Sequence, residues 1–169
     1  MHNQNTVQWD LHVPQAIEPQ NSEHRVLHEC LCHVIGNTCR IYRTSQCYSW
    51  NVRGYGAFYA RKCFKQQANE MCKAVNTLAI HIRGLGMTVV MDYSDVTMSA
   101  NPPKTKEMID LADMFRNLSK AYVEAENSLG AAIDVANSID DPSTVQVLAS
   151  RMNAQRAHHQ ELNLLAESL

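Results

Sequence analysis

The helical rhythm between residues 64 and 85 constrains the fold more than any other feature of the chain. Seven apolar residues recur there at steps of four and three: Phe64, Ala68, Met71, Val75, Leu78, Ile82 and Leu85. Because an α-helix turns once every 3.6 residues, this spacing places all seven on one face. A stripe of this length needs an equally long apolar surface to cover it, so the pattern predicts a bundle of long helices.

Similar stripes predict three further helices. The four are expected at residues 22–48, 57–86, 105–138 and 142–168, with a short extra helix near residues 93–98. Residues 87–104 then form one long crossover between the second and third helices, so the fold class is an all-α four-helix bundle. The side chains expected in the core are Phe64, Met71, Val75, Leu78, Leu111, Phe115, Leu118 and Tyr122.

Length and composition predict one domain with a polar extension. The chain has 169 residues, 45% of them hydrophobic, which suits a single core. Residues 1–21 are polar and lack periodicity, so they are expected to form a flexible tail before the bundle of residues 22–169. No apolar run approaches the roughly 20 residues of a membrane span, and the first 24 residues lack Lys and Arg, which argues against a secretory signal.

The six cysteines form no C-x-x-C pair, a spacing that zinc and thioredoxin-type sites often use. They are therefore expected to be free thiols in a reducing cytoplasm. All six fall inside the expected helices: Cys30, Cys32, Cys39, Cys47, Cys63 and Cys72.

Four short patches, in this order and spacing, carry a resemblance to a known family. They are Trp50-Asn51-Val52-Arg53-Gly54, Ile82-Arg83-Gly84-Leu85-Gly86, Asp140-Asp141-Pro142-Ser143 and Arg151-Met152. Over about residues 25–168 the chain resembles the Dps family of mini-ferritins. The resemblance implies a ferritin-like bundle, a homo-oligomeric cage of twelve subunits, and a role in iron storage under oxidative stress.

The chemistry of that family is not matched. The resemblance implies a ferroxidase centre between two subunits, built from a His before the Trp, a His and a carboxylate on the second helix, and the partner's Asp and Glu. The corresponding positions here are Ser49, Arg61, Lys65, Asn76 and Ile80. Iron prefers imidazole and carboxylate donors, whereas Arg and protonated Lys offer no lone pair. The two cations also oppose a metal ion by charge. At about 4 Å and an effective dielectric constant of 20, each would repel one unit of positive charge by about 4 kcal/mol. No catalytic residue and no cofactor is therefore expected at the family site.

Two other family features are weakened. Asp140 and Asp141 match acidic residues that the resemblance places at a pore, but Val145 stands where a further acidic residue is usual. The tail has no Lys or Arg before Arg25, so it cannot neutralise phosphates, and no tail-mediated binding of nucleic acid is expected.

Iron could bind elsewhere, and three groups of residues are candidates. His158, His159 and Glu161 lie close together on the last expected helix. His24, His28 and Cys32 form a stripe on the first, and His2 and His12 lie in the tail. Histidines that are simply hydrogen-bonded in the interior or at an interface are the alternative interpretation.

These observations favour a cage subunit without the usual ferroxidase centre. Its role would be a shell, a storage compartment, or co-assembly with an active paralogue in a mixed cage. Two alternatives stay open: an active ferroxidase that uses a displaced site, and a cage that protects DNA. No membrane partner is expected.

Overall fold

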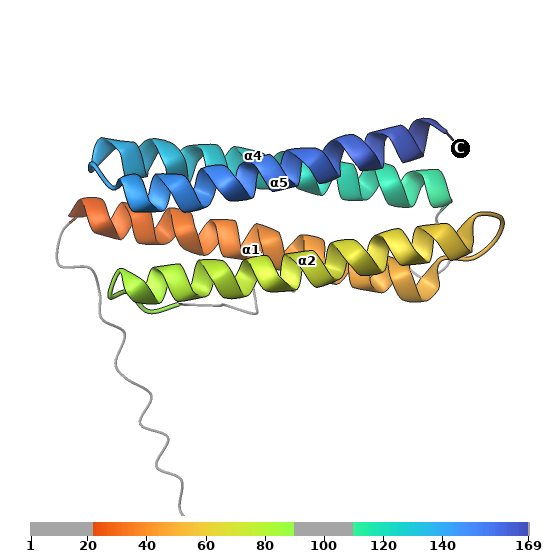
Figure 1. The fold of residues 1–169 in the computed structure, drawn as a ribbon, viewed down its shortest axis with the longest axis horizontal. Coiled ribbons are helices and arrows are strands. Elements are labelled where there is room, and N and C mark those ends of the chain that lie inside the picture. Colours follow the sequence, from red (N-terminus) through yellow and green to blue (C-terminus); the bar gives the residue numbers. More distant parts are fainter. Residues whose placement is uncertain (1–21, 90–109, 169) are drawn as a thin grey trace, which may run out of the picture.

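The computed structural model describes residues 22–89 and 110–168, and this part of the chain is entirely helical apart from its turns (Figure 1). The helices are α1 (Ser22–Asn51), α2 (Ala57–Gly84), α4 (Leu111–Ser138) and α5 (Pro142–Glu167). The expected all-α four-helix bundle is confirmed.

The four helices form two antiparallel pairs. α1 packs along α2, α4 packs along α5, and the two pairs are joined mainly through α1 and α4 (Figure 1). α2 and α5 contact each other much less than these pairs do, and we call the line along which they meet the seam. The chain passes from one pair to the other between Gly84 and Leu111, which confirms the long crossover.

Two of the expected helix boundaries are wrong. α1 continues to Asn51, so Ser49, Trp50 and Asn51 lie on the helix and not in the connection. No Gly or Pro interrupts this stretch, and the Asn51 side chain donates to the Cys47 carbonyl one turn back, at 2.8 Å. α4 begins at Leu111 and not near residue 105, because the backbone of Asp110 is extended; the Asp110 side chain makes no capping hydrogen bond. The tail and the short helix expected near residues 93–98 lie outside the described residues.

Backbone conformation explains where the helices turn. Gly54 and Gly56 adopt positive φ angles of 93° and 78° in the α1–α2 connection. Gly86, with φ of 79°, ends α2 in a Schellman motif, in which Gly86 N donates to Arg83 O and Met87 N to Ile82 O. Asp140 occupies the same position after α4 with φ of 54°, and it is the only described residue other than Gly with positive φ.

The core agrees with the expected apolar stripes. Six of the eight expected side chains are buried, namely Phe64, Met71, Leu78, Phe115, Leu118 and Tyr122. Val75 and Leu111 are partly buried at the edge of the core. Phe64 is the centre of an aromatic group, with ring centroids 5.5 Å from Tyr48 and 4.9 Å from Phe115.

The six cysteines are free thiols. None of the described helices combines the length and hydropathy needed to cross a membrane.

Candidate functional site

Ser49 lies on α1, and its side chain faces inward. It is 4% exposed, and its hydroxyl donates to the Gln46 carbonyl one turn back, at 2.7 Å. This hydrogen bond is local to α1, so Ser49 is held as an ordinary helical serine.

The other four positions assigned by the resemblance lie on α2, on the side that faces away from the core. Arg61, Lys65, Asn76 and Ile80 are all exposed, and Ile80 keeps 73% of its surface in solvent. The pairs 61/65 and 76/80 are each one turn apart, as helical spacing requires. The two pairs are separated by 15 residues, or about 22 Å at 1.5 Å per residue. One chain therefore cannot bring all four side chains to one site.

These five side chains do not fit an iron centre. The Arg61 guanidinium makes a single long contact, 3.5 Å, with the Val52 carbonyl. The Ser49 hydroxyl donates to its own helix, and Ile80 has no donor atom. Across residues 22–89 and 110–168, no three His, Cys, Asp or Glu side chains are placed to hold a metal ion together.

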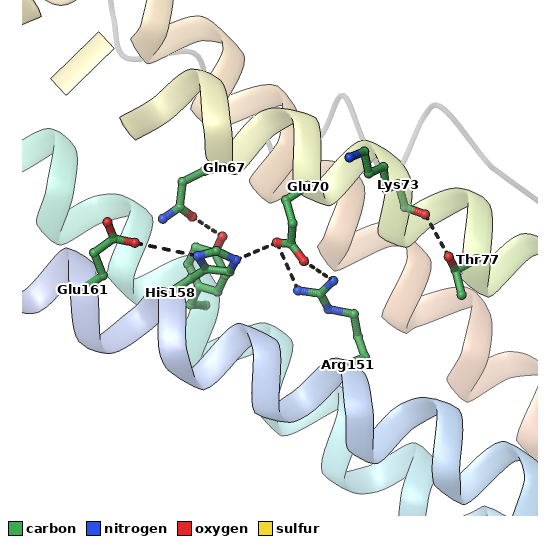
Figure 2. Close-up of polar contacts among 8 residues, drawn as sticks. Gln67, Glu70, Lys73, Thr77, Arg151, His158 and Glu161 are labelled. Carbon is green, nitrogen blue, oxygen red and sulfur yellow. Dashed lines mark hydrogen bonds and ion pairs between the residues drawn. The ribbon is translucent and has the colours of Figure 1, made fainter. Parts of the chain in front are cut away.

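His158 and Glu161 belong to a polar cluster on the seam between α2 and α5 (Figure 2). At its centre, Glu70 of α2 accepts two hydrogen bonds from Arg151 of α5, at 2.7 and 3.3 Å. His158 Nε2 lies 2.7 Å from Glu70 Oε2, the oxygen that also accepts the longer Arg151 hydrogen bond. His158 Nδ1 lies 3.8 Å from Glu161. We call Glu70, Arg151 and His158 the seam cluster, and Glu161 lies at its edge. It ties together α2 and α5, two neighbouring helices that otherwise contact each other little.

The charge of Glu70 is strongly favoured in the seam cluster. Partial burial alone would raise its pKa, but the hydrogen bonds and positive charges of His158 and Arg151 outweigh burial and lower the pKa to about 2. Arg151 is only 10% exposed, and this carboxylate is its counter-charge on the seam. The seam cluster is thus a structural ion-pair network, in which Arg151 and His158 both bind the Glu70 carboxylate.

Tyr122 and Gln67 lie directly behind the seam cluster. The Tyr122 hydroxyl donates to the Gln67 side-chain carbonyl, and the Tyr122 ring centroid lies 6.1 Å from that of His158. Burial, assisted by the charge of Glu70, raises the pKa of Tyr122, so its hydroxyl stays protonated and remains a donor.

His159 does not join this cluster. It points toward α4, where its Nδ1 lies 3.3 Å from Glu126, which also pairs with Arg156 at 3.4 Å. The structure therefore does not bring His158, His159 and Glu161 to one site, although they lie within four residues of one another.

The histidine stripe of α1 also has a structural explanation. His28 Nε2 lies 2.7 Å from the Thr88 carbonyl, and the Cys32 sulfur lies 3.6 Å from the same nitrogen. His24, one turn earlier, is exposed. His28 therefore fastens the start of the crossover to α1. His2 and His12 lie outside the described residues.

Asp140 and Asp141 have different surroundings. Asp140 is exposed, whereas Asp141 caps α5 by accepting a hydrogen bond from Thr144 N, at 3.0 Å. The Thr144 hydroxyl bonds the same carboxylate and lies 2.7 Å from His81 Nε2. Burial alone would raise the pKa of Asp141, but the hydrogen bonds from Thr144 and the nearby His81 lower it. Asp141 is thus committed to the turn.

Sequence reasoning missed Glu70, the central residue of the seam cluster. It is the only acidic residue on α2, a helix that otherwise carries Lys and Arg. That isolation was a usable signal, because a lone carboxylate among cations is often an ion-pair partner.

Comparisons with known proteins define the class. A sequence model described as the Ferritin-like domain matches residues 31–169. The chain therefore belongs to the ferritin-like family. No protein of curated function matches the sequence significantly.

Solved structures narrow the fold to the Dps type, as the sequence resemblance predicted. A Dps protein from Bacillus brevis superposes with a TM-score of 0.78 at 20% identity, covering 87% of this chain and 99% of the other. Dps from Vibrio cholerae, described as a member of a superfamily of ferritin-like diiron-carboxylate proteins, gives a TM-score of 0.76 at 17% identity, covering 85% and 90%. Antigen TpF1 from Treponema pallidum gives 0.77 at 12% identity, covering 88% and 96%.

Proposed function

We propose that this chain is a cytoplasmic subunit of a Dps-type cage that lacks the usual ferroxidase centre between subunits. Its role is to build a shell, to form a storage compartment filled by other means, or to co-assemble with an active paralogue. The single observation that carries the proposal is the set of side chains at the five family positions. They present two cations, a hydroxyl bonded to its own helix, an amide and an alkyl group, and none is an imidazole or a carboxylate.

The direct test is ferrous oxidation by the purified protein, with oxygen or hydrogen peroxide as the oxidant. We expect no acceleration over a protein-free control. A matched variant restores the family ligands through Ser49→His, Arg61→His, Lys65→Asp, Asn76→Asp and Ile80→Glu. Because helix register is retained, this variant should gain oxidation.

Both arms can contradict the proposal. Rapid oxidation by the wild-type protein would overturn it. If that activity fell on His158→Ala or His159→Ala, the displaced-site alternative would replace it. A restored variant that assembles normally but stays inactive would show that the five positions do not meet across subunits.

Assembly and DNA binding need separate measurements. Native mass spectrometry should give a closed cage, twelve subunits by the family resemblance, and should reveal any second chain in protein purified from its own cells. In a gel-shift titration over salt concentration, deleting residues 1–21 should leave DNA binding unchanged, since the tail supplies almost no cations.

A further inference from the structure

Charge is divided between the two helix pairs. Residues 22–89 contain nine Lys and Arg and three Asp and Glu, a formal charge of +6. Residues 110–168 contain four Lys and Arg and nine Asp and Glu, a formal charge of −5. The near-neutral total of the whole chain hides this separation.

The positive charge is concentrated on one face of α2. Eight of the solvent-facing residues on this face recur at steps of three and four, and Arg61 and Lys73 lie beside them. We call these ten residues the α2 outer face: Phe58, Arg61, Lys62, Lys65, Asn69, Cys72, Lys73, Asn76, Ile80 and Arg83. Five of the ten are cations, spread over about 33 Å of helix. A surface cleft of about 480 Å³ lies along the middle of this face and is lined by Lys62, Lys65, Gln66, Asn69, Glu70 and Lys73.

This charge is not neutralised within the described chain. Glu70 is the only carboxylate of α2, and Arg151 and His158 already hold it on the seam. Lys62, Lys65 and Lys73 form no ion pair with any described carboxylate, whereas Arg40, Arg151 and Arg156 all do.

Apolar side chains accompany the cations. Of the eight large hydrophobic residues exposed in the described chain, five lie on α2, at the end of α1 or in the turn that joins them: Trp50, Tyr55, Phe58, Tyr59 and Ile80. Aromatic side chains and Arg are enriched in protein interfaces, and a gathering of exposed apolar groups marks a surface that another protein covers.

A second copy of the same face is a poor partner. In an isologous contact the same patch lies on both sides of the two-fold axis. Every charge contributed by two α2 outer faces would then be positive, so no cross-subunit ion pair could form between them. Like charges that face each other across an interface disfavour association.

We propose that the α2 outer face docks a partner chain whose facing surface carries carboxylates, in preference to a second α2 outer face. The inference rests on the proposed function, because it gives the chemistry of the partner in a mixed cage. Carboxylates on the partner would supply the counter-charges that Lys62, Lys65 and Lys73 lack among residues 22–89 and 110–168.

A charge-reversed variant of this chain is the probe. The variant carries Lys62→Glu, Lys65→Glu and Lys73→Glu, and it is mass-tagged and co-expressed with the wild-type chain. Native mass spectrometry of dimers released from the assembly then counts mixed and unmixed pairs. Random association gives the 1:2:1 proportion, in which mixed and unmixed pairs are equal in number. At low salt we expect the ratio of mixed to unmixed pairs to rise by on the order of ten-fold, the sum of several weak exposed ion pairs.

Two controls keep the test specific. The matched variant carries Arg116→Glu, Lys120→Glu and Arg156→Glu, which reverse three cations on α4 and α5 and change the net charge as much as the α2 variant does. It should mix with the wild-type chain at random. Neutral substitution of the same α2 lysines by Gln should strengthen pairing of the variant with itself relative to wild type. High salt should weaken mixed pairs and strengthen wild-type pairs, because it screens attraction and repulsion alike.

Random mixing of the charge-reversed chain, or wild-type pairs that weaken with salt, would overturn the inference. A short bis-maleimide linker that joins Cys72 to Cys72 of a second wild-type chain efficiently at low salt would do the same. None of these outcomes bears on iron oxidation by the wild-type chain, so failure here is distinguishable from failure of the proposed function.

Discussion

Replacing Glu70 by Gln tests the energetic role of the seam cluster. In the folded chain the pKa of Glu70 falls from its ordinary value of 4.5 to about 2, a difference of about 2.5. Each pKa unit corresponds to about 1.36 kcal/mol, which gives an upper bound of about 3.4 kcal/mol. Because the Glu70 side chain is 31% exposed, solvent screening reduces this figure, and we expect a loss of about 2 kcal/mol.

The pH dependence fixes the sign of this contribution. A carboxylate with a depressed folded pKa stabilises the protein fully above its unfolded pKa and loses that effect as the folded pKa is approached. The stability difference between wild type and Glu70→Gln should therefore be largest near neutral pH and shrink as pH falls from about 4.5 toward 2.

Urea unfolding followed by circular dichroism measures the difference. Protein concentration must be held constant, because assembly stabilises folded subunits. Glu29→Gln is the matched control: it removes an i,i+4 pair with Arg25 whose side chains are 59% and 71% exposed, and it should cost less than about 0.5 kcal/mol. Equal losses for the two variants, or a Glu70→Gln loss independent of pH between 7 and 3, would refute the reasoning.

Three further predictions follow from single residues. Asp140→Gly should raise stability by up to about 1 kcal/mol, since Asp140 has a φ of 54°; thermal unfolding that shows a loss would contradict the backbone argument. Gln155→Met should stabilise by about 1 kcal/mol in urea titrations, because the buried Gln155 amide has no hydrogen-bond partner among the described residues; destabilisation would indicate a bound water in its place. In alkylation at pH 8 followed by mass spectrometry, exposed Cys72 should react well before Cys63, whose pKa burial raises to about 11, and the reverse order would contradict the burial.

The fold could be predicted because long apolar stripes leave few ways to bury themselves. Phe64 and Met71 alone specify which side of α2 faces inward, and the same register places Arg61 and Lys65 outward. Helix ends were harder to predict. α1 runs past residue 48 because its last turn contains no Gly or Pro, and α4 starts late because the backbone of Asp110 is extended.

The seam cluster could not be predicted, since it depends on how two helices distant in sequence are rotated against each other. Glu70 and Arg151 are 81 residues apart, and no local pattern links them. His158 and His159 are neighbours in the sequence, yet one faces α2 and the other faces α4. Successive residues of a helix point about 100° apart, so these two neighbouring side chains of α5 point toward different helices.

The division into two helical hairpins also bears on the order in which the chain folds. Within each hairpin the connection is short, so α1 can find α2, and α4 can find α5, at small loop-closure entropy. Docking one hairpin on the other must instead close the segment between Gly84 and Leu111. The contact of α2 with α5 then forms after both hairpins exist. Substitution of Arg151 should accordingly speed unfolding while leaving the refolding rate almost unchanged, which stopped-flow measurements can resolve.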